Sequence, residues 1–339
     1  MLSLIEKRKQ EHVELCLKKD VEYEHVKSGF SDVELELSSK KLAKSEIDTS
    51  TELLGKPLAL PFEIEAMTGG YAGATAINKK LAKAAQENGI IFCLGSQRAM
   101  IELPRLAGTF KVRDVAPDAL IFGNIGYAQL KSVNSEKIDD ALKEVGADAI
   151  YVHINPIQER LQQEGDRISE EQEQQMVADI ARMRKELSFP VAVKETGSGM
   201  PAEFLSRLKS AGIKIVNVSG AGGTAWGKIE LMRGGKGDYE KGVIPTVDSI
   251  LAGREVGGLT LIASGGIRGG VDVAKAIALG ASIGGAALPF LREPNPSSLV
   301  KKWADDLKKA MSECGASNIS ELQNTGVILK GETAERLMK

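Results

Sequence analysis

The alternation of short apolar runs with helical patterns is the feature that most constrains the fold of this 339-residue chain. Apolar runs typical of buried strands occur at 58–66, 90–94, 119–124, 148–154, 190–194, 215–219, 260–263 and 283–287. Helical patterns follow them at about 74–88, 98–107, 136–145, 170–187, 201–211, 246–256, 270–279 and 296–313. The runs are continuously apolar, which is typical of a parallel sheet covered by helices. These units predict one α/β domain, a (β/α)8 TIM barrel.

Residues 1–56 precede the repeating units and differ from them in character. Residues 3–18 have a charged helical pattern, and 19–56 are polar and poorly periodic. This part is too polar to bury a core alone, so we expect an N-terminal helix and arm that cover the barrel formed by 57–339. A doubly wound open sheet is the alternative architecture. Glycine loops after the last two strands favour the closed barrel.

The stretch 264–281, SGGIRGGVDVAKAIALGA, predicts a phosphate-binding turn. Gly265 and Gly266 follow a buried strand and allow a sharp turn that brings backbone N–H groups close to a ligand. The helix that opens at Asp272 adds a dipole that favours an anion. A second glycine turn is expected at 283–287, and two such loops form the phosphate site of many barrels. The alternative is that these glycines only make tight turns.

The composition excludes several classes of function. A net charge of −2 gives no electrostatic basis for binding nucleic acid. The chain has no apolar run of about eighteen residues that would span a membrane, and we expect no signal peptide. Cys16, Cys93 and Cys314 lie far apart, which is typical of buried thiols in a reducing compartment. We therefore expect a cytoplasmic protein.

Polar residues follow most of the predicted strands, where a barrel carries its chemistry. Lys194 and Arg98 suit anions, and Glu159 suits Mg2+ if a diphosphate supplies the other oxygens. Each assignment has an alternative. Glu159 could be a helix cap or a surface charge, His153 a structural histidine, and Lys194 a Schiff-base lysine. The basic residues at 8–9 could simply form a solvated face.

Six motifs carry a resemblance to a known family. They are RKxEH at 8–12, MTGG at 67–70, GSQR at 95–98, HxNxxQE at 153–159, SGxGGT at 219–224 and SGGIR at 264–268. In this order they resemble the type 2 isopentenyl-diphosphate isomerases, which are FMN-dependent barrels, over most of the chain. The SGGIR stretch alone is shared with other FMN barrels. The one departure is Gln10, where many members carry an acidic residue.

The resemblance implies a cofactor, a metal and a set of site residues. FMN would contact Ala66, Met67, Thr68, Ser96, Asn124, Lys194, Ser219 and Thr224, with its phosphate on Gly265, Gly266, Ile267, Arg268, Ala286 and Ala287. The diphosphate substrate would be received by Arg8, Lys9, Ser96, Gln97, Arg98, His153 and Gln158. Gln158, His153 and Lys194 would be catalytic, and Glu159 would ligate Mg2+. NADPH or NADH would reduce the flavin, and the protein would be a homo-oligomer, a tetramer or an octamer.

The reaction implied by the resemblance is the reversible isomerisation of isopentenyl diphosphate to dimethylallyl diphosphate in isoprenoid biosynthesis. It adds a proton to one carbon and removes one from another, with no net change of oxidation state. Gln158 cannot ionise, and His153 and Glu159 are assigned to phosphate and metal. The hypothesis is therefore that reduced FMN shuttles the proton and that Lys194 stabilises its anionic form.

Two other functions remain as alternatives. An FMN-dependent 2-hydroxy-acid oxidase or dehydrogenase has a similar phosphate loop, but it needs a histidine and an arginine after the sixth strand, where 219–224 has neither. A flavin- or phosphate-binding regulator would have no reason to retain Glu159 and the basic N-terminal helix. The segment 225–242, rich in glycine and charge, is expected to form a mobile lid in which Trp226 covers the substrate or anchors the lid. Residues 315–339 have no assigned role.

Overall fold

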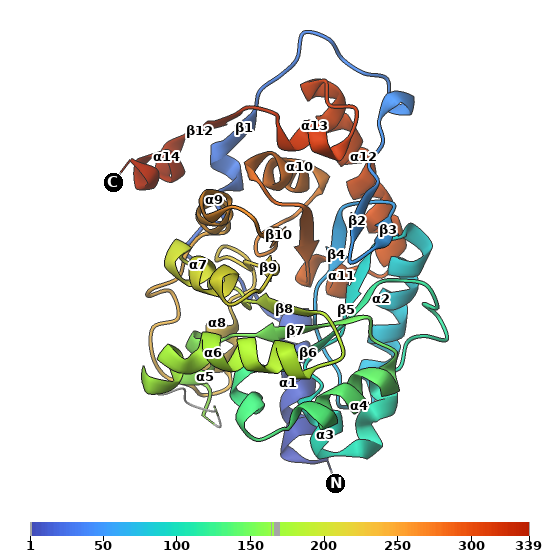
Figure 1. The fold of residues 1–339 in the computed structure, drawn as a ribbon, viewed down its shortest axis with the longest axis vertical. Coiled ribbons are helices and arrows are strands. Elements are labelled where there is room, and N and C mark those ends of the chain that lie inside the picture. The colour runs from blue at the N-terminus through green and yellow to red at the C-terminus, as the bar shows by residue number, and fades with distance from the viewer. Residues whose placement is uncertain (1, 164, 166–169, 339) are drawn as a thin grey trace.

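The computed structural model describes residues 2–163, 165 and 170–338, and its centre is a closed barrel of parallel strands (Figure 1). The strands are β4 (Phe62–Ile64), β5 (Ile91–Cys93), β6 (Ile121–Gly126), β7 (Ala149–His153), β8 (Val191–Lys194), β9 (Ile215–Asn217), β10 (Thr260–Ala263) and β11 (Ile283–Ala286). The barrel closes where β11 pairs with β4, with Gly284 opposite Phe62. The predicted (β/α)8 barrel is confirmed, and the open sheet is excluded.

Helices follow the strands and form an outer layer around them. The long ones are α2 (Ala74–Asn88), α4 (Ser135–Val145), α6 (Glu170–Glu186), α7 (Ala202–Ser210), α9 (Thr246–Val256), α10 (Gly270–Leu279) and α12 (Pro296–Cys314). The helix predicted over 98–107 is divided: α3 (Arg98–Glu102) ends before a 3-10 helix, Pro104–Thr109. Pro104 has no N–H to continue α3, and it restricts Leu103, which has φ −131° and ψ 85°.

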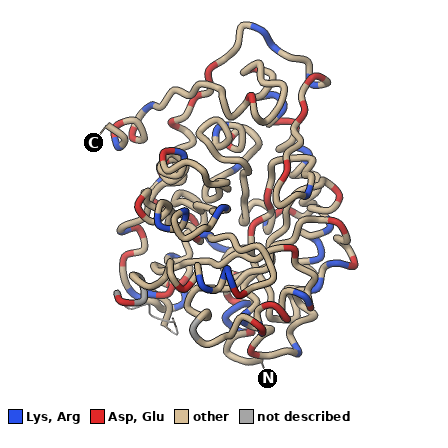
Figure 2. The backbone as a smooth tube through the Cα atoms, in the orientation of Figure 1, with Lys and Arg blue, Asp and Glu red and all other residues tan. Residues whose placement is uncertain are grey.

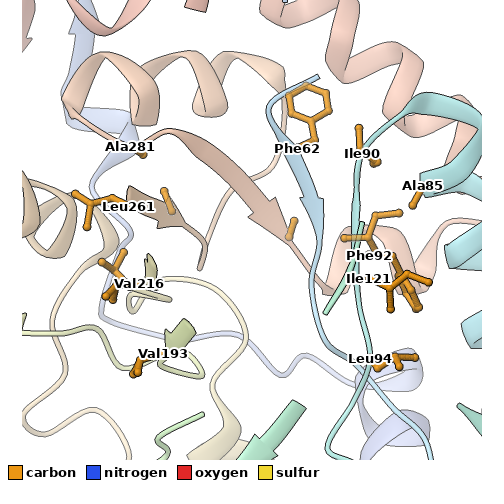
Figure 3. Close-up of a cluster of buried hydrophobic side chains, with 14 of the residues drawn as sticks. Phe62, Ala85, Ile90, Phe92, Leu94, Ile121, Val193, Val216, Leu261 and Ala281 are labelled. Atoms are coloured by element: carbon orange, nitrogen blue, oxygen red, sulfur yellow. The ribbon is translucent and has the colours of Figure 1, made fainter. Parts of the chain in front are cut away.

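Two hydrophobic layers hold the barrel together, because successive side chains of a strand point to opposite faces. Outward-facing residues such as Phe92 and Leu261 pack between the strands and the helices (Figure 3). Inward-facing residues fill the interior, where the rings of Phe122 and Tyr151 stack with their centroids 4.5 Å apart. Each large apolar side chain buried in these layers contributes about 1.5–3 kcal/mol.

The arm before the barrel closes both of its ends. Helix α1 (Leu4–Lys18) begins at a capping box in which Ser3 and Glu6 satisfy each other's backbone N–H groups. The hairpin of β2 (Thr51–Leu53) and β3 (Lys56–Leu58) packs Leu53 and Leu58 against the inward-facing residues of the strands. The hairpin crosses the boundary drawn between 56 and 57, so the arm and the barrel share this element.

The C-terminal segment joins the arm on the outside of the barrel. It contains α13 (Ile319–Gln323), β12 (Val327–Leu329) and α14 (Gly331–Leu337). Strand β12 pairs antiparallel with β1 (Val33–Leu35), with Val33 opposite Leu329 (Figure 1). This pairing gives residues 315–338 a structural place that their sequence does not indicate.

Several segments differ from their predictions. The strand predicted over 58–66 is divided between β3 and β4, with Pro61 between them. Gly284 and Gly285 lie inside β11 rather than in a turn, and a Cβ on Gly284 would lie 2.8 Å from Val273 of α10. Close packing of helix on strand therefore explains Gly284.

Two predicted loops contain helices. The HxNxxQE segment includes α5 (Pro156–Leu161), which begins at a proline because the first helical position needs no N–H donor. The segment expected to be a mobile lid begins with α8 (Trp226–Met232), whose Ile229 and Glu230 are buried. The remaining short helix, α11 (Leu288–Arg292), follows β11.

Basic and acidic residues are interspersed over the molecule (Figure 2), in keeping with the net charge of −2. None of the helices in the described part of the chain has the length and apolarity needed to cross a membrane.

Candidate active site

A cavity at the carboxyl ends of the strands brings together most of the predicted site residues. Those that line it are Arg8, Lys9, Ala66, Met67, Ser96, Arg98, Asn124, His153, Gln158, Glu159, Lys194, Ser219, Thr224, Gly265, Gly266, Ile267, Arg268, Ala286 and Ala287. Arg8 and Lys9 reach it from α1 of the same chain. The fold thus brings all of these residues to one cavity, and the role of each stays a prediction.

Thr68 and Gln97 are the two predicted site residues that do not line this cavity. The side chain of Gln97 is buried, where its Oε1 accepts from the Asn124 N–H at 3.0 Å and its Nε2 donates to the Ala141 carbonyl at 3.3 Å. Thr68 is also buried, and its carbonyl accepts from the Gly95 N–H at 3.2 Å. Both residues hold neighbouring loops in place, so the structure gives Gln97 no route to a substrate in the cavity.

One end of the cavity is built from backbone. Gly265 and Gly266 have φ of 95° and 73°, values that favour glycine. A Cβ on Gly265 would lie 2.0 Å from the carbonyl oxygen of Gly220, and one on Gly223 would lie 2.3 Å from the nitrogen of Gly266. Side chains are therefore excluded from a turn that precedes α10. Such a backbone surface fits the phosphate of a nucleotide cofactor such as FMN.

Basic side chains meet at the opposite wall. Burial, and after it the nearby charges of Arg8 and Arg98, lower the pKa of Lys9 to about 7, although the charge of Glu159 acts in the opposite direction. Placing cations together in this way is unfavourable, and a bound anion would relieve it in addition to Glu159 and to Glu102, whose Oε1 accepts from Nε of Arg98 at 2.6 Å. The wall therefore fits a strongly anionic ligand.

His153 lies at the end of β7 and is neutral. Burial lowers its pKa to about 3, assisted by the charges of Lys194 and Lys9. Its Nδ1 lies 2.7 Å from Oδ1 of Asn124, which can only accept, so the proton sits on Nδ1. Nε2 is then an acceptor. An anion bound beside the ring would raise the pKa of His153 again.

Glu159 is buried on the first turn of α5. Its Oε1 accepts from Nδ2 of Asn155 at 3.0 Å. Across the described residues, no group of three or more acidic, histidine or cysteine side chains is placed to hold a metal ion. A divalent cation on Glu159 would therefore need oxygens from its ligand.

Glu230 of α8 is a site residue that sequence reasoning missed. It is buried, and its carboxylate accepts from Nε2 of His12 at 2.9 Å, Nε2 of Gln158 at 3.1 Å and Nη1 of Arg233 at 2.6 Å. Burial raises its pKa, but the hydrogen bonds from His12 and Gln158 and the charge of Arg233 outweigh burial and lower it. Glu230 therefore stays ionised and fixes the amide of Gln158.

The floor of the cavity is a second region that the motifs did not reveal. Nζ of Lys194 donates to the carbonyl of Glu195 at 2.8 Å and lies 3.4 Å from Oε2 of Glu65. Glu65 itself lines the cavity, as do His12 and Trp226. An acidic residue inside a strand pattern resembles a surface position in sequence, and only closure of the barrel turns it inward.

The fold and the phosphate-type turn are those of an FMN-dependent barrel protein. Residues 124–329 match the family of FMN-dependent dehydrogenases. Among solved structures, a mandelate oxidase mutant with an FMN adduct is similar, with a TM-score of 0.66 and 15% identity over 94% of this chain and 92% of that one. At this identity the likeness concerns the fold alone.

Closer relatives define the family within this class. The isopentenyl-diphosphate delta-isomerase of Methanococcoides burtonii is 40% identical over 97% of this chain and 94% of its own. The one from Thermococcus kodakarensis is 39% identical over 97% and 93%, and the one from Halobacterium salinarum 40% over 97% and 95%. The chain belongs to the FMN-dependent, type 2 isopentenyl-diphosphate delta-isomerases.

Proposed function

We propose that this isomerase interconverts isopentenyl and dimethylallyl diphosphate at the cavity described above, with FMN, Mg2+ and NAD(P)H. The observation that carries the proposal is the pairing, in one cavity, of a backbone phosphate turn at 264–268 with a separate wall of cations. The first feature suits the phosphate of a cofactor. The second suits the diphosphate of a substrate.

The diphosphate is held by Arg8, Lys9 and Arg98, with Ser96 and His153 beside them. Charge-assisted hydrogen bonds contribute about 1.5–3 kcal/mol each, so three cations could supply most of the affinity for a small substrate. Glu159 would hold Mg2+ together with diphosphate oxygens. Its carboxylate is the acidic ligand available there, and Asn155 fixes its orientation through the 3.0 Å hydrogen bond.

FMN fits the site because the turn at 264–268 excludes side chains and the neighbouring residues Ala286 and Ala287 line the same cavity. Met67, Ser96, Asn124, Lys194, Ser219 and Thr224 would surround its ring. When bound and reduced, FMN would supply the exchangeable proton of the reaction, with NADPH or NADH as the reductant that is not consumed in each turnover. Lys194 supplies a positive charge toward the ring.

The chain's own residues orient the reaction. Gln158 cannot ionise, and its amide is fixed at both ends, by Glu230 at 3.1 Å and by Nδ2 of Asn155 at 3.1 Å. It therefore positions the substrate or a water molecule. His153 is neutral before the diphosphate binds, so its Nε2 is able to take up a proton once the anion is present.

An absorbance spectrum of the purified protein and an anaerobic isomerase assay test the proposal. Flavin absorbance, activity with NADPH- or dithionite-reduced FMN, and none with oxidised FMN are expected. Full turnover with oxidised FMN and no reductant contradicts the proton-shuttle role. A colourless protein that does not take up FMN contradicts the whole proposal, and bleaching of the flavin by lactate supports a 2-hydroxy-acid oxidase instead.

We also propose that the protein acts in the cytoplasm as a homo-oligomer, a tetramer or an octamer, in line with the resemblance to its family. The membership of Arg8 and Lys9 in the cavity of their own chain supports a site complete within one subunit. Light scattering of the purified protein measures the assembly.

A further inference from the structure

Directly below the cavity, the barrel interior holds a buried polar cluster that the proposed reaction uses only through Lys194. Glu63 lies on β4 and Glu65 directly follows it, while Lys194 lies on β8 and Asn217 on β9. Glu63 and Asn217 are inaccessible to solvent, and Glu65 and Lys194 are each 5% exposed. Two acids face one lysine in a space where an unpaired charge is strongly unfavourable.

Hydrogen bonds tie the cluster together. Nδ2 of Asn217 donates to Oε1 of Glu63 at 3.1 Å and also to Oε1 of Glu65. The Tyr151 hydroxyl donates to Oε2 of Glu63 at 2.9 Å. Ser264, the first residue of the phosphate turn, donates to Oδ1 of Asn217 at 2.8 Å. The cluster is therefore a continuous network that reaches the cofactor-binding turn.

The surroundings of the two carboxyl groups favour a proton on Glu63 over one on Glu65. Burial raises the pKa of Glu63 well above its ordinary value, and the charge of Glu65 and the hydrogen bond to it raise it further. Burial also raises the pKa of Glu65, but the charge of Lys194 and the hydrogen bond from Asn217 outweigh burial and lower it. Among the other ionisable neighbours, burial raises the pKa values of Tyr151 and Cys93. The pKa of Glu195, which interacts with the charge of Lys194, is raised to about 7, mainly by burial.

The geometry separates the two acids by position as well as by charge. Glu65 lines the cavity beside Lys194, with 3.4 Å between Oε2 and Nζ, whereas Glu63 lies deeper and does not line it. Gly285 of β11 leaves the necessary room, since a Cβ there would lie 3.1 Å from Oε1 of Glu65 and 3.3 Å from Cβ of Glu63. The strand is thus built around these carboxyl groups.

We propose that Glu65 is the counter-ion of Lys194 and a positioning residue for the cofactor: it limits how strongly Lys194 stabilises negative charge on the flavin ring and so sets the reduction potential of bound FMN. Glu63 takes part as a neutral hydrogen-bonding partner. The inference rests on the proposed function, because it requires FMN in this cavity.

The experiment compares Glu65→Gln with the matched control Glu63→Gln in the FMN-loaded enzyme. The midpoint potential is measured anaerobically against a reference dye, and FMN affinity by fluorescence quenching. Glu65→Gln leaves the charge of Lys194 unopposed, so reduced FMN should be favoured over oxidised FMN at least about tenfold more than in the wild type, which is about 30 mV upward for a two-electron couple. Glu63→Gln should leave the potential unchanged, because an amide replaces a neutral carboxyl.

A double variant keeps the test decisive if Glu65→Gln does not fold. Glu65→Gln with Lys194→Gln removes both members of the ion pair, a change that buried sites often tolerate. If the charge of Glu65 offsets that of Lys194 as proposed, removing both should leave the preference for reduced FMN within about twofold of the wild type. If Lys194 acts unopposed in the wild type, the preference falls about tenfold, which overturns the proposal.

The outcomes separate this inference from the proposed function. An enzyme that binds FMN and isomerises its substrate, but whose potential is the same in wild type and Glu65→Gln, retains the function and overturns the counter-ion role. Equal shifts in Glu63→Gln and Glu65→Gln also overturn it, since the role would then belong to the cluster as a whole. A wild type that binds no FMN overturns both.

Discussion

The lysine at the wall of the cavity and the lysine at its floor have different charged neighbours. At the wall, Lys9 lies near Arg8 and Arg98, and burial and these charges lower its pKa to about 7. At the floor, Lys194 lies 3.4 Å from the carboxylate of Glu65. Lys9 therefore lies among other cations, whereas Lys194 has a carboxylate of the protein itself beside it.

This difference indicates what each region is for. An entering anion further relieves the repulsion within a cluster of cations, so the wall is suited to a ligand that binds and leaves in every turnover. An ion pair at the floor is complete by itself, and it is suited to a group that stays bound. The following variants test whether the wall and the floor are distinct in this way.

The largest effect is expected for Glu159→Gln, which removes the proposed acidic ligand of Mg2+ at the wall. Loss of a residue that only supports a metal ligand lowers metal affinity about 10–100-fold, so loss of the ligand itself should raise the Mg2+ requirement at least about 100-fold or abolish activity. A Mg2+ titration of isomerase activity measures it. Glu87→Gln on α2 is the control, since its carboxylate lies on the outer surface. Unchanged Mg2+ dependence would show that Glu159 is no ligand.

Lys9→Met should weaken binding of isopentenyl diphosphate about 10–100-fold, the equivalent of one charge-assisted contact. Lys7→Met on the exposed side of the same helix is the matched control and should change the affinity less than about twofold. Calorimetric titration in the presence of Mg2+ compares the two. Equal losses in both variants would mean that α1 attracts the substrate by its overall charge.

The affinity for the diphosphate should fall as the pH rises through about 7, by up to about tenfold per pH unit. In the free protein Lys9 has a pKa of about 7, and a bound anion raises it. Binding at pH 8 therefore requires proton uptake by Lys9, and binding below pH 6 does not. Calorimetry in buffers of different ionisation enthalpy detects this uptake, which should be absent in Lys9→Met. Uptake that persists in Lys9→Met would assign it to another group such as His153.

The sequence predicted the parts of this molecule that depend on local patterns. The barrel followed from the period of apolar residues, and the phosphate turn from Gly265 and Gly266, since a positive φ leaves few alternatives to glycine. Most of the residues named from the motifs line the cavity, and their roles there stay predictions. Gln97 was misplaced because its motif fixes its position in the chain and not the direction of its side chain.

The parts that were missed depend on contacts between distant segments. Glu230 forms a hydrogen bond with His12, which lies 218 positions away in the chain. The sequence around Glu230 is rich in glycine and charged residues, so it was predicted to be a lid. Glu63 and Glu65 meet Asn217 only because the barrel closes. A buried acid and a surface acid look alike in sequence, since the partners that make burial possible lie elsewhere.

The smallest effect is expected for Glu230→Gln. This variant tests whether the wall depends on a carboxylate that contacts Gln158 and His12 rather than the substrate. Glu230 lies behind Gln158 and His12, so its loss should disturb their orientation while the cations that hold the diphosphate stay in place. One or two weakened hydrogen bonds correspond to about 1 kcal/mol, and kcat should therefore fall about threefold to tenfold with little change in KM. Steady-state kinetics of Glu11→Gln provide the control, because Glu11 contacts the same Arg233 from the exposed side, at 3.1 Å. A rise in KM with kcat unchanged would instead mean that Glu230 contributes to substrate binding. Positioning residues and anion-binding residues could then no longer be separated on this side of the cavity.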